Sequence, residues 1–287
     1  MKILFITENS NYDYLRDSIF IGLVNNGHEV IDTNYLWMMG PLSEEEAFNT
    51  FCRGFTYGNV LSGDRKFIDR AGIEEKINAH YYDLVIYGSL RRCFDYYDAV
   101  KKHYKRSEIV FLDGEDDQRI DFSLAREGVY FKRELSIDAS YALPISFSIP
   151  SCKLCYGLVT KTRSEAFITP YDKSTYIYTK EEDYYNDYRE SVFAYTCRKG
   201  GWDCLRHYEI VANKCLPYFM DYDGKPTYTM VKWPSDLQSE ANSLYRSWDD
   251  EQDYHHDRVF KLIDDFFYYT CNNLTCEKMA EYMLNRI

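Results

Sequence analysis

The sequence predicts an α/β protein with two Rossmann-like domains, and three observations lead to this fold class. The chain begins with an apolar run at residues 2–7, a helical pattern at 14–27 and a second strand at 28–34, an order that favours a parallel sheet. Strands and helices then keep alternating for about 130 residues, which is typical of a Rossmann-like unit. After a connection at 143–151, which contains two prolines, the alternation resumes.

The elements of the first domain follow from short apolar runs and from helical spacing. Apolar residues at 15, 19, 20, 23 and 24 share one helical face, and Gly27 stands where a helix commonly ends. The polar segment 40–66 predicts helix and loop. Further helices are expected before residue 83 and at 96–104, and further strands at 83–88, 108–112 and 128–135.

The second domain shows the same alternation over a shorter stretch. Residues 175–201 predict a strand, an acidic helix, a second strand and a turn with two glycines. A helix at 203–215 and a strand at 216–220 follow, and the pattern is helical from about 236 to 285. We expect the last helix to pack back on the first domain.

Composition excludes several classes of protein. A hydrophobic fraction of 45% is enough for a packed core, and a net charge of −12 argues against a nucleic-acid-binding surface. No uninterrupted apolar stretch approaches 18 residues and the first residues lack a signal-peptide pattern, so neither a membrane span nor secretion is expected. Nine scattered cysteines indicate reduced thiols and a cytoplasmic location. The 29 tyrosines suit a cleft for polar ligands.

The stretch "RKGGWDCLRHYEIVANKCLPYF" at 198–219 holds most of the candidate site residues. Gly200 and Gly201 allow the backbone to turn sharply and to approach a ligand closely. Asp203 is expected to cap the helix that follows, whose N-terminus is a natural anion site.

Arg206 and Glu209 share a second face of this helix. An arginine can bind a phosphate through two parallel hydrogen bonds, and a glutamate one turn further can accept hydrogen bonds from a ribose diol. Together they would hold a nucleoside diphosphate. The alternative, an ordinary Arg–Glu pair on a helix surface, has equal support from the pattern alone.

This segment resembles the donor-binding segment of GT-B glycosyltransferases. It is similar to the exostosin-like pattern D-S-x-R-x-x-E followed by a C-I-P strand, with a cysteine in place of the serine, and to the family 1 pattern R-H-Y-E-I-x-A-x-G. The resemblance implies that Glu209 holds the donor ribose and that Arg206 lies near the diphosphate. The matching residues are Asp203, Arg206, Glu209, Cys215 and Pro217, with Cys204 at the serine position.

Two departures from the family pattern bear on the mechanism. Retaining enzymes of this fold often carry a glutamate eight positions before the matched one, where this chain has Gly201. The family often has glycine after the helix, where this chain has Lys214; a positive φ there would cost about 1 kcal/mol. The first departure favours an inverting reaction.

An inverting transferase needs a general base that takes the proton of the acceptor hydroxyl. Asp113, Glu115 and Asp116 follow the strand at 108–112, and ligands of open α/β sheets bind beyond the carboxyl ends of strands. The alternative for this segment is an acidic loop in solvent.

Basic side chains could neutralise the leaving diphosphate. Lys132 and Arg133 stand at the end of another strand, and Lys199 precedes the two glycines. The alternative for the first two is a surface ion pair with Glu134.

Metal sites have weaker support in the sequence. Asp221 and Asp223 form a D-x-D after a strand, as in metal-dependent GT-A transferases, but Gly224 follows them and a turn is favoured. Cys152 and Cys155 have zinc-like spacing without a second pair of ligands at finger distance. We therefore expect no metal and no cofactor.

These observations combine into one prediction. Two Rossmann-like domains face a cleft in a GT-B-like arrangement, with residues 1–151 binding the acceptor and residues 152–287 binding a nucleotide-sugar. The enzyme would transfer the sugar to a hydroxyl of a glycan, lipid or protein. The alternatives are a metal-dependent GT-A-like transferase and a non-catalytic sugar- or nucleotide-binding protein on a transferase-like fold. The expected donor-binding residues are Lys199, Gly200, Gly201, Trp202, Asp203, Arg206, His207, Glu209, Lys132 and Arg133.

Overall fold

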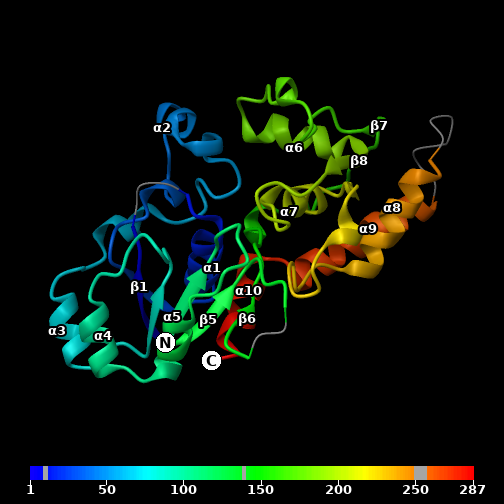
Figure 1. Cartoon of the computed structure of the whole chain (residues 1–287). Coiled ribbons are helices and arrows are strands. Elements are labelled where there is room, and N and C mark those ends of the chain that lie inside the picture. The colour runs from blue at the N-terminus through cyan, green and yellow to red at the C-terminus, as the bar shows by residue number, and fades with distance from the viewer. Residues whose placement is uncertain (9–11, 138–139, 249–256) are drawn as a thin grey trace.

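The computed structural model describes residues 1–8, 12–137, 140–248 and 257–287, and it contains two separate parallel sheets (Figure 1). The first sheet has six strands in the order β2-β1-β3-β4-β5-β6 and the second has three in the order β7-β8-β9. The predicted Rossmann-like α/β class is confirmed. The strands are β1 (Lys2–Ile6), β2 (Glu29–Asp32), β3 (Leu84–Tyr87), β4 (Ile109–Asp113), β5 (Val129–Lys132), β6 (Leu143–Pro144), β7 (Arg163–Glu165), β8 (Ser191–Thr196) and β9 (Leu216–Phe219).

Most α-helices of the described residues lie at predicted positions, whereas the helix Phe122–Glu127 was not predicted. Gly27 has a φ of 79° directly after the first helix, which is the left-handed conformation expected of a glycine there. The helices are α1 (Tyr14–Asn25), α2 (Glu44–Asn49), α3 (Ile73–Asn78), α4 (Tyr97–His103), α5 (Phe122–Glu127), α6 (Glu181–Arg189), α7 (Leu205–Ala212), α8 (Ser235–Arg246), α9 (Asp257–Asn273) and α10 (Cys276–Leu284).

The prediction of a strand at the start of residues 175–201 is wrong. Lys173–Thr175 form a 3-10 turn, and Thr175 Oγ1 donates a hydrogen bond to the Asp172 carbonyl at 2.6 Å, a local bond that competes with strand pairing. The third strand of the small sheet is β7, which pairs with β8 through Arg163 opposite Ser191. Three polar residues give β7 no apolar pattern from which it could be predicted.

The last helix, α10, packs against α1 of the first sheet. The helices approach so closely that a side chain at Gly22 would overlap the Cys276 carbonyl and lie 2.9 Å from Ala280 Cβ. Asn25 Nδ2 also donates to Glu277 Oε1 at 2.8 Å. The C-terminal helix therefore forms part of the layer that covers the first sheet (Figure 1).

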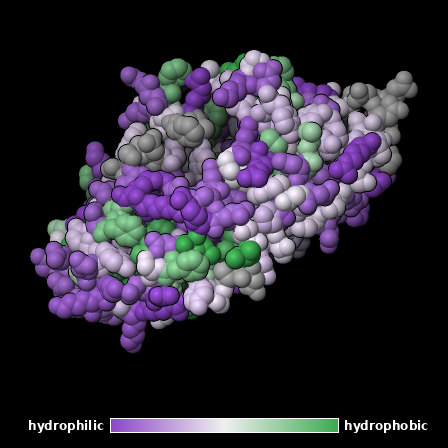
Figure 2. Space-filling view, in the orientation of Figure 1, coloured by the Kyte–Doolittle hydropathy of each residue, from purple (hydrophilic) through white to green (hydrophobic). Residues whose placement is uncertain are grey.

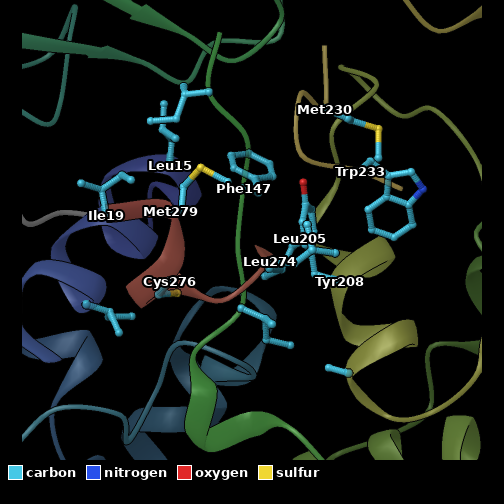
Figure 3. Packing of buried hydrophobic residues seen from close by; sticks show 14 of the residues in the cluster. Leu15, Ile19, Phe147, Leu205, Tyr208, Met230, Trp233, Leu274, Cys276 and Met279 are labelled. Atoms are coloured by element: carbon cyan, nitrogen blue, oxygen red, sulfur yellow. The ribbon is translucent and has the colours of Figure 1, made fainter. Parts of the chain in front are cut away.

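One hydrophobic cluster connects the two sheets. Leu15 of α1 and Met279 of α10 lie near Phe147 of the connecting segment, and Tyr208 of α7 with Trp233 continues the packing on the other side (Figure 3). The cluster thus contains buried side chains from both parts of the chain. None of the described helices combines the length and the apolar composition needed to cross a membrane.

Candidate functional site

A cleft of about 770 Å³ lies between the two sheets and is lined by residues from both. In the space-filling view the surface is hollowed between the part that carries α2 and the part that carries α6 (Figure 2). Seven aromatic side chains line the cleft, together with six basic and five acidic ones. The aromatic residues are Tyr12, Tyr14, Phe55, Phe147, Tyr176, Tyr178 and Tyr184.

Glu209 of α7 lies in this cleft with both carboxylate oxygens engaged. Its side chain is almost buried, at 7% exposure. Oε2 accepts a hydrogen bond from Tyr184 OH at 2.5 Å, and Oε1 accepts one from Thr56 Oγ1. Burial raises the pKa of Glu209, and the hydrogen bonds from Thr56 and Tyr184 oppose this shift. Two hydroxyl donors therefore hold the carboxylate in a fixed orientation.

Arg206 stands one turn before Glu209 and also lines the cleft. Nη2 donates to Tyr176 OH at 2.8 Å, and the guanidinium lies 5.0 Å from the centre of the Tyr176 ring. Nη1 is buried without a hydrogen-bond partner among the described residues. No ion pair of the described residues joins Arg206 to Glu209, so the two do not form the surface pair that the sequence left open.

The other carboxylates of the cleft have partners within the protein. Asp13 and Glu115 accept N–H groups of Arg92 at 3.0 and 3.1 Å. Asp116 pairs with Arg133, which comes from the end of β5. These three carboxylates therefore already have an arginine partner before any ligand binds.

Four of the six basic side chains of the cleft, by contrast, have no carboxylate partner among the described residues. Within the described part of the chain, no carboxylate lies within 4.0 Å of Arg53, Lys173, Lys199 or Arg206. Lys199 Nζ donates to the Pro170 carbonyl at 2.8 Å instead. In a chain with 46 acidic and 34 basic residues, four cations without a carboxylate partner among the described residues make this cleft suited to an anionic ligand.

The glycine turn before α7 is packed tightly against side chains of the first sheet. A Cβ at Gly200 would overlap the Asp116 carboxylate, and one at Gly201 would overlap Glu134 and lie 2.8 Å from Arg133 Nη1. Neither glycine has a positive φ. The buried Glu134 and Arg133 make glycine necessary at position 201 for space rather than for backbone conformation. At position 200 the neighbour is the end of the exposed Asp116 side chain, which can move.

Asp203 lines the cleft but does not cap α7. The N-cap is Cys204, which makes no side-chain capping bond. The Asp203 carboxylate instead accepts from the Phe147 amide and from Tyr208 OH, both at 2.7 Å. Burial raises its pKa to about 6, and the charge of Arg133 opposes this shift. The capping prediction is wrong because the Asp203 carboxylate accepts a hydrogen bond from the distant Phe147 amide and not from the first amides of α7.

Asp113 and Lys132 lie outside the cleft, so they do not contact a ligand bound there. Both are fully buried, and Lys132 Nζ donates to Asp113 Oδ1 at 2.9 Å. Tyr130 OH donates to the other oxygen at 2.5 Å. Burial lowers the pKa of Lys132, and Asp113 opposes the shift. Of the predicted bases, only Glu115 and Asp116 line the cleft.

Trp202 and His207 are also core residues and not part of the cleft wall. His207 is fully buried, with Nδ1 at 2.7 Å from Thr196 Oγ1 and Nε2 at 2.9 Å from the Trp202 carbonyl. Its ring lies 4.5 Å from that of Phe219. Burial lowers its pKa to about 3, so the imidazole is neutral.

Several charged cleft residues were not recognised in the sequence, namely Asp13, Arg53, Arg92 and Lys173. Asp13 caps α1, accepting from the Arg16 amide at 3.2 Å, and its place after the first strand could have indicated it. Arg53 lies in the 3-10 turn Phe51–Gly54, between β2 and β3. No motif marks it, because its position in the cleft depends on how a long loop folds.

The candidate metal residues are separate from the cleft. Asp221 precedes the 3-10 turn Tyr222–Gly224 after β9, and Asp223 lies within this turn; Asp221 accepts from the Arg198 amide at 3.3 Å. Among the described residues, no three His, Cys, Asp or Glu side chains are grouped so that they could hold a metal ion. Cys152 and Cys155 are free thiols.

Fold and site together define an α/β protein with a basic, aromatic cleft between two parallel sheets. The chain matches no protein-family model, and no curated protein sequence matches it.

Proposed function

We propose that this protein is a GT-B-like glycosyltransferase that moves a sugar from a nucleotide-sugar donor to a hydroxyl acceptor without a metal ion. The observation that carries the proposal is the charge pattern of the cleft. Its carboxylates have internal partners, whereas Arg53, Lys173, Lys199 and Arg206 have no carboxylate partner among the described residues. A diphosphate is a ligand that would neutralise such a group of cations.

The parts of a nucleotide-sugar fit the contacts around α7. The diphosphate would lie against Arg206 and Lys199, near the N-terminus of the helix. Each oxygen of Glu209 accepts one hydrogen bond within the protein, and a carboxylate offers about four acceptor sites, so a ribose diol could still bind it. The aromatic side chains would cover the base and the sugar, and a volume of about 770 Å³ suits such a ligand.

The transfer itself would use a carboxylate of the first sheet. The acceptor oxygen attacks the anomeric carbon and forms the new C–O bond. Its proton passes to Glu115 or Asp116, while the bond to the diphosphate breaks and the nucleoside diphosphate leaves. Asp13 is a further candidate for this role, because it lines the same wall.

The space around Gly201 supports inversion over the retaining mechanism that uses a glutamate at this position. Glu134 occupies the place where a side chain at position 201 would begin, and it accepts hydrogen bonds from the Asp203 amide and from Arg133. A glutamate at 201 would displace this buried carboxylate.

One observation favours a second function, the binding of a nucleotide-sugar without transfer. Glu115 and Asp116 are each paired with an arginine, so neither carboxylate is free to face the hydroxyl of an acceptor. A binding protein would take up the donor and release it unchanged.

The test is donor binding and turnover in the presence of EDTA, with UDP-, GDP- and ADP-sugars as probes. Wild-type protein should be stabilised by a donor, by about 2.7 kcal/mol at a hundred times its Kd. Glu209→Gln should weaken binding about tenfold, since one charged acceptor is lost. Glu127→Gln, which removes an exposed partner of Lys101, is the control and should bind as wild type. A donor panel without any binding would refute the proposal, and binding without turnover would leave the second function.

A further inference from the structure

Arg53 carries a guanidinium for which the protein itself provides no anion. Arg53 is half-buried and lines the cleft, and its guanidinium makes no hydrogen bond or ion pair with the described residues. The guanidinium carbon lies 4.6 Å from the centre of the Phe48 ring. Nη1 is buried without a partner among the described residues. A buried charged donor without an acceptor is costly, and a ligand anion would remove this cost.

The segment around Arg53 is anchored to the second sheet's side of the cleft. The Thr56 amide donates to Glu181 Oε1 at 2.5 Å, and Thr56 Oγ1 lies 2.8 Å from Tyr185 OH while it also donates to Glu209. Thr56 has a φ of 71°, which is rare for a β-branched residue. The anchoring contacts hold this conformation and thereby fix the position of Arg53.

The loop that carries Arg53 also contacts residues around Arg206 through the ring of Phe55. Phe55 stacks on Tyr184 at 5.7 Å with an angle of 21°, and Tyr184 is the residue that donates to Glu209. Arg206, one turn before Glu209, also has a buried Nη1 without a partner among the described residues. Two guanidinium nitrogens without a partner among the described residues therefore belong to side chains that line one cleft, one from the loop between β2 and β3 and one from α7.

We propose that Arg53, from the loop between β2 and β3, and Arg206, from α7, bind one anionic group in the cleft, and that this group is the diphosphate of the nucleotide ligand. The identity of the ligand rests on the proposed function, whereas the anion site rests on the two arginines. A diphosphate adjoins the ribose in a nucleotide, as Arg206 adjoins Glu209 on α7. The first sheet's half of the molecule therefore contributes directly to donor binding.

The experiment is isothermal titration calorimetry with inorganic pyrophosphate, with UDP, GDP and ADP, and with the corresponding nucleosides. Arg53→Gln should weaken binding of pyrophosphate and of the bound nucleoside diphosphate at least about tenfold, and leave nucleoside affinity within about twofold. Arg53→Lys keeps the charge and the fold of the segment, so its affinity for pyrophosphate and for the nucleoside diphosphate should fall less than that of Arg53→Gln. Thermal melting of each variant verifies folding.

The matched control is Arg198→Gln. Arg198 also lies over an aromatic ring, that of Trp202 at 5.3 Å, but it does not line the cleft. This variant should bind every probe as wild type does.

Each outcome decides one of the two proposals. Unchanged diphosphate and pyrophosphate affinities in Arg53→Gln would overturn the role of Arg53 and leave the proposed function standing. Arg53-dependent binding of pyrophosphate, without binding of any nucleotide or nucleotide-sugar, would support the anion site and refute the glycosyltransferase. If wild-type protein binds neither pyrophosphate nor a nucleotide, both proposals fall.

Discussion

At the scale of single residues, His207 shows how burial decides the role of an ionisable side chain. Its ring is enclosed between Thr196, the Trp202 carbonyl and Phe219. A protonated imidazole there would bring a charge into the core, which explains why its pKa falls to about 3. In the unfolded chain the pKa returns to about 6.5.

This difference predicts a pH dependence of stability. Below pH 6.5 the imidazole of His207 binds a proton in the unfolded state, whereas in the folded state it stays neutral down to about pH 3. The free energy of unfolding therefore falls as pH falls through this window. His207→Gln removes the effect. Relative to this variant, wild-type protein should lose about 1.4 kcal/mol per pH unit below pH 6.

Urea denaturation of both proteins between pH 8 and pH 4.5 is the measurement. Asp203, with its raised pKa, titrates in part of the same range, but it is present in both proteins and cancels in the difference. A difference that stays constant with pH would show that folding does not lower the pKa of His207.

The local pattern in the sequence predicted some of the site residues but not those that depend on distant contacts. Arg206, Lys199 and Glu209 were found because a helix repeat and a glycine turn place them on one segment. Arg53 and Asp13 belong to other segments that reach the cleft only through tertiary folding. Spacing along one helix cannot indicate such partners.

At the scale of elements, the packing of α10 on α1 depends on the absence of a side chain at Gly22. The Cys276 carbonyl occupies the place of its Cβ, and backbone cannot move aside as a flexible side chain can. The contact therefore requires glycine at this position of α1.

Gly22→Ala is expected to separate the two helices. Overpacking of this kind typically costs 1–3 kcal/mol, and a backbone clash places this variant at about 3 kcal/mol, although alanine favours an isolated helix. Denaturant unfolding measures the loss. Gly157→Ala is the control, because nothing lies within 4 Å of a Cβ there and its φ is not positive; an equal effect of both substitutions would contradict the packing explanation.

The elements that the sequence predicted are those with an apolar period or a capping residue. The strands at 83–88 and 108–112 and the helix after Gly201 are of this kind. β6 and β7 hold two and three residues and lack a periodic pattern, and the Tyr-rich start of 175–201 has strand propensity without a strand partner. Propensity is overridden where pairing is decided by distant segments.

At the scale of the whole molecule, two sheets share one hydrophobic cluster. Residues of α1 and α10 and residues of α7 and β9 belong to it, so opening the contact between the two parts would expose core side chains. The cost of this exposure links the stability of one sheet to that of the other.

Unfolding should therefore occur in one cooperative transition. Far-UV circular dichroism reports on both sheets, whereas tryptophan fluorescence is weighted toward the second, because three of the four tryptophans follow residue 200. The two signals should give the same midpoint in urea. Separate midpoints would show that the shared cluster does not couple the two parts.

The packing of α10 on α1 also affects how the chain folds during synthesis on the ribosome. All six strands of the first sheet are translated well before residues 276–284 leave the exit tunnel. Until then α1 presents an uncovered apolar face, a state in which nascent chains attract chaperones or aggregate. The strands of the first sheet are therefore synthesised early, but the helix layer that covers this sheet is complete only after α10 has left the ribosome.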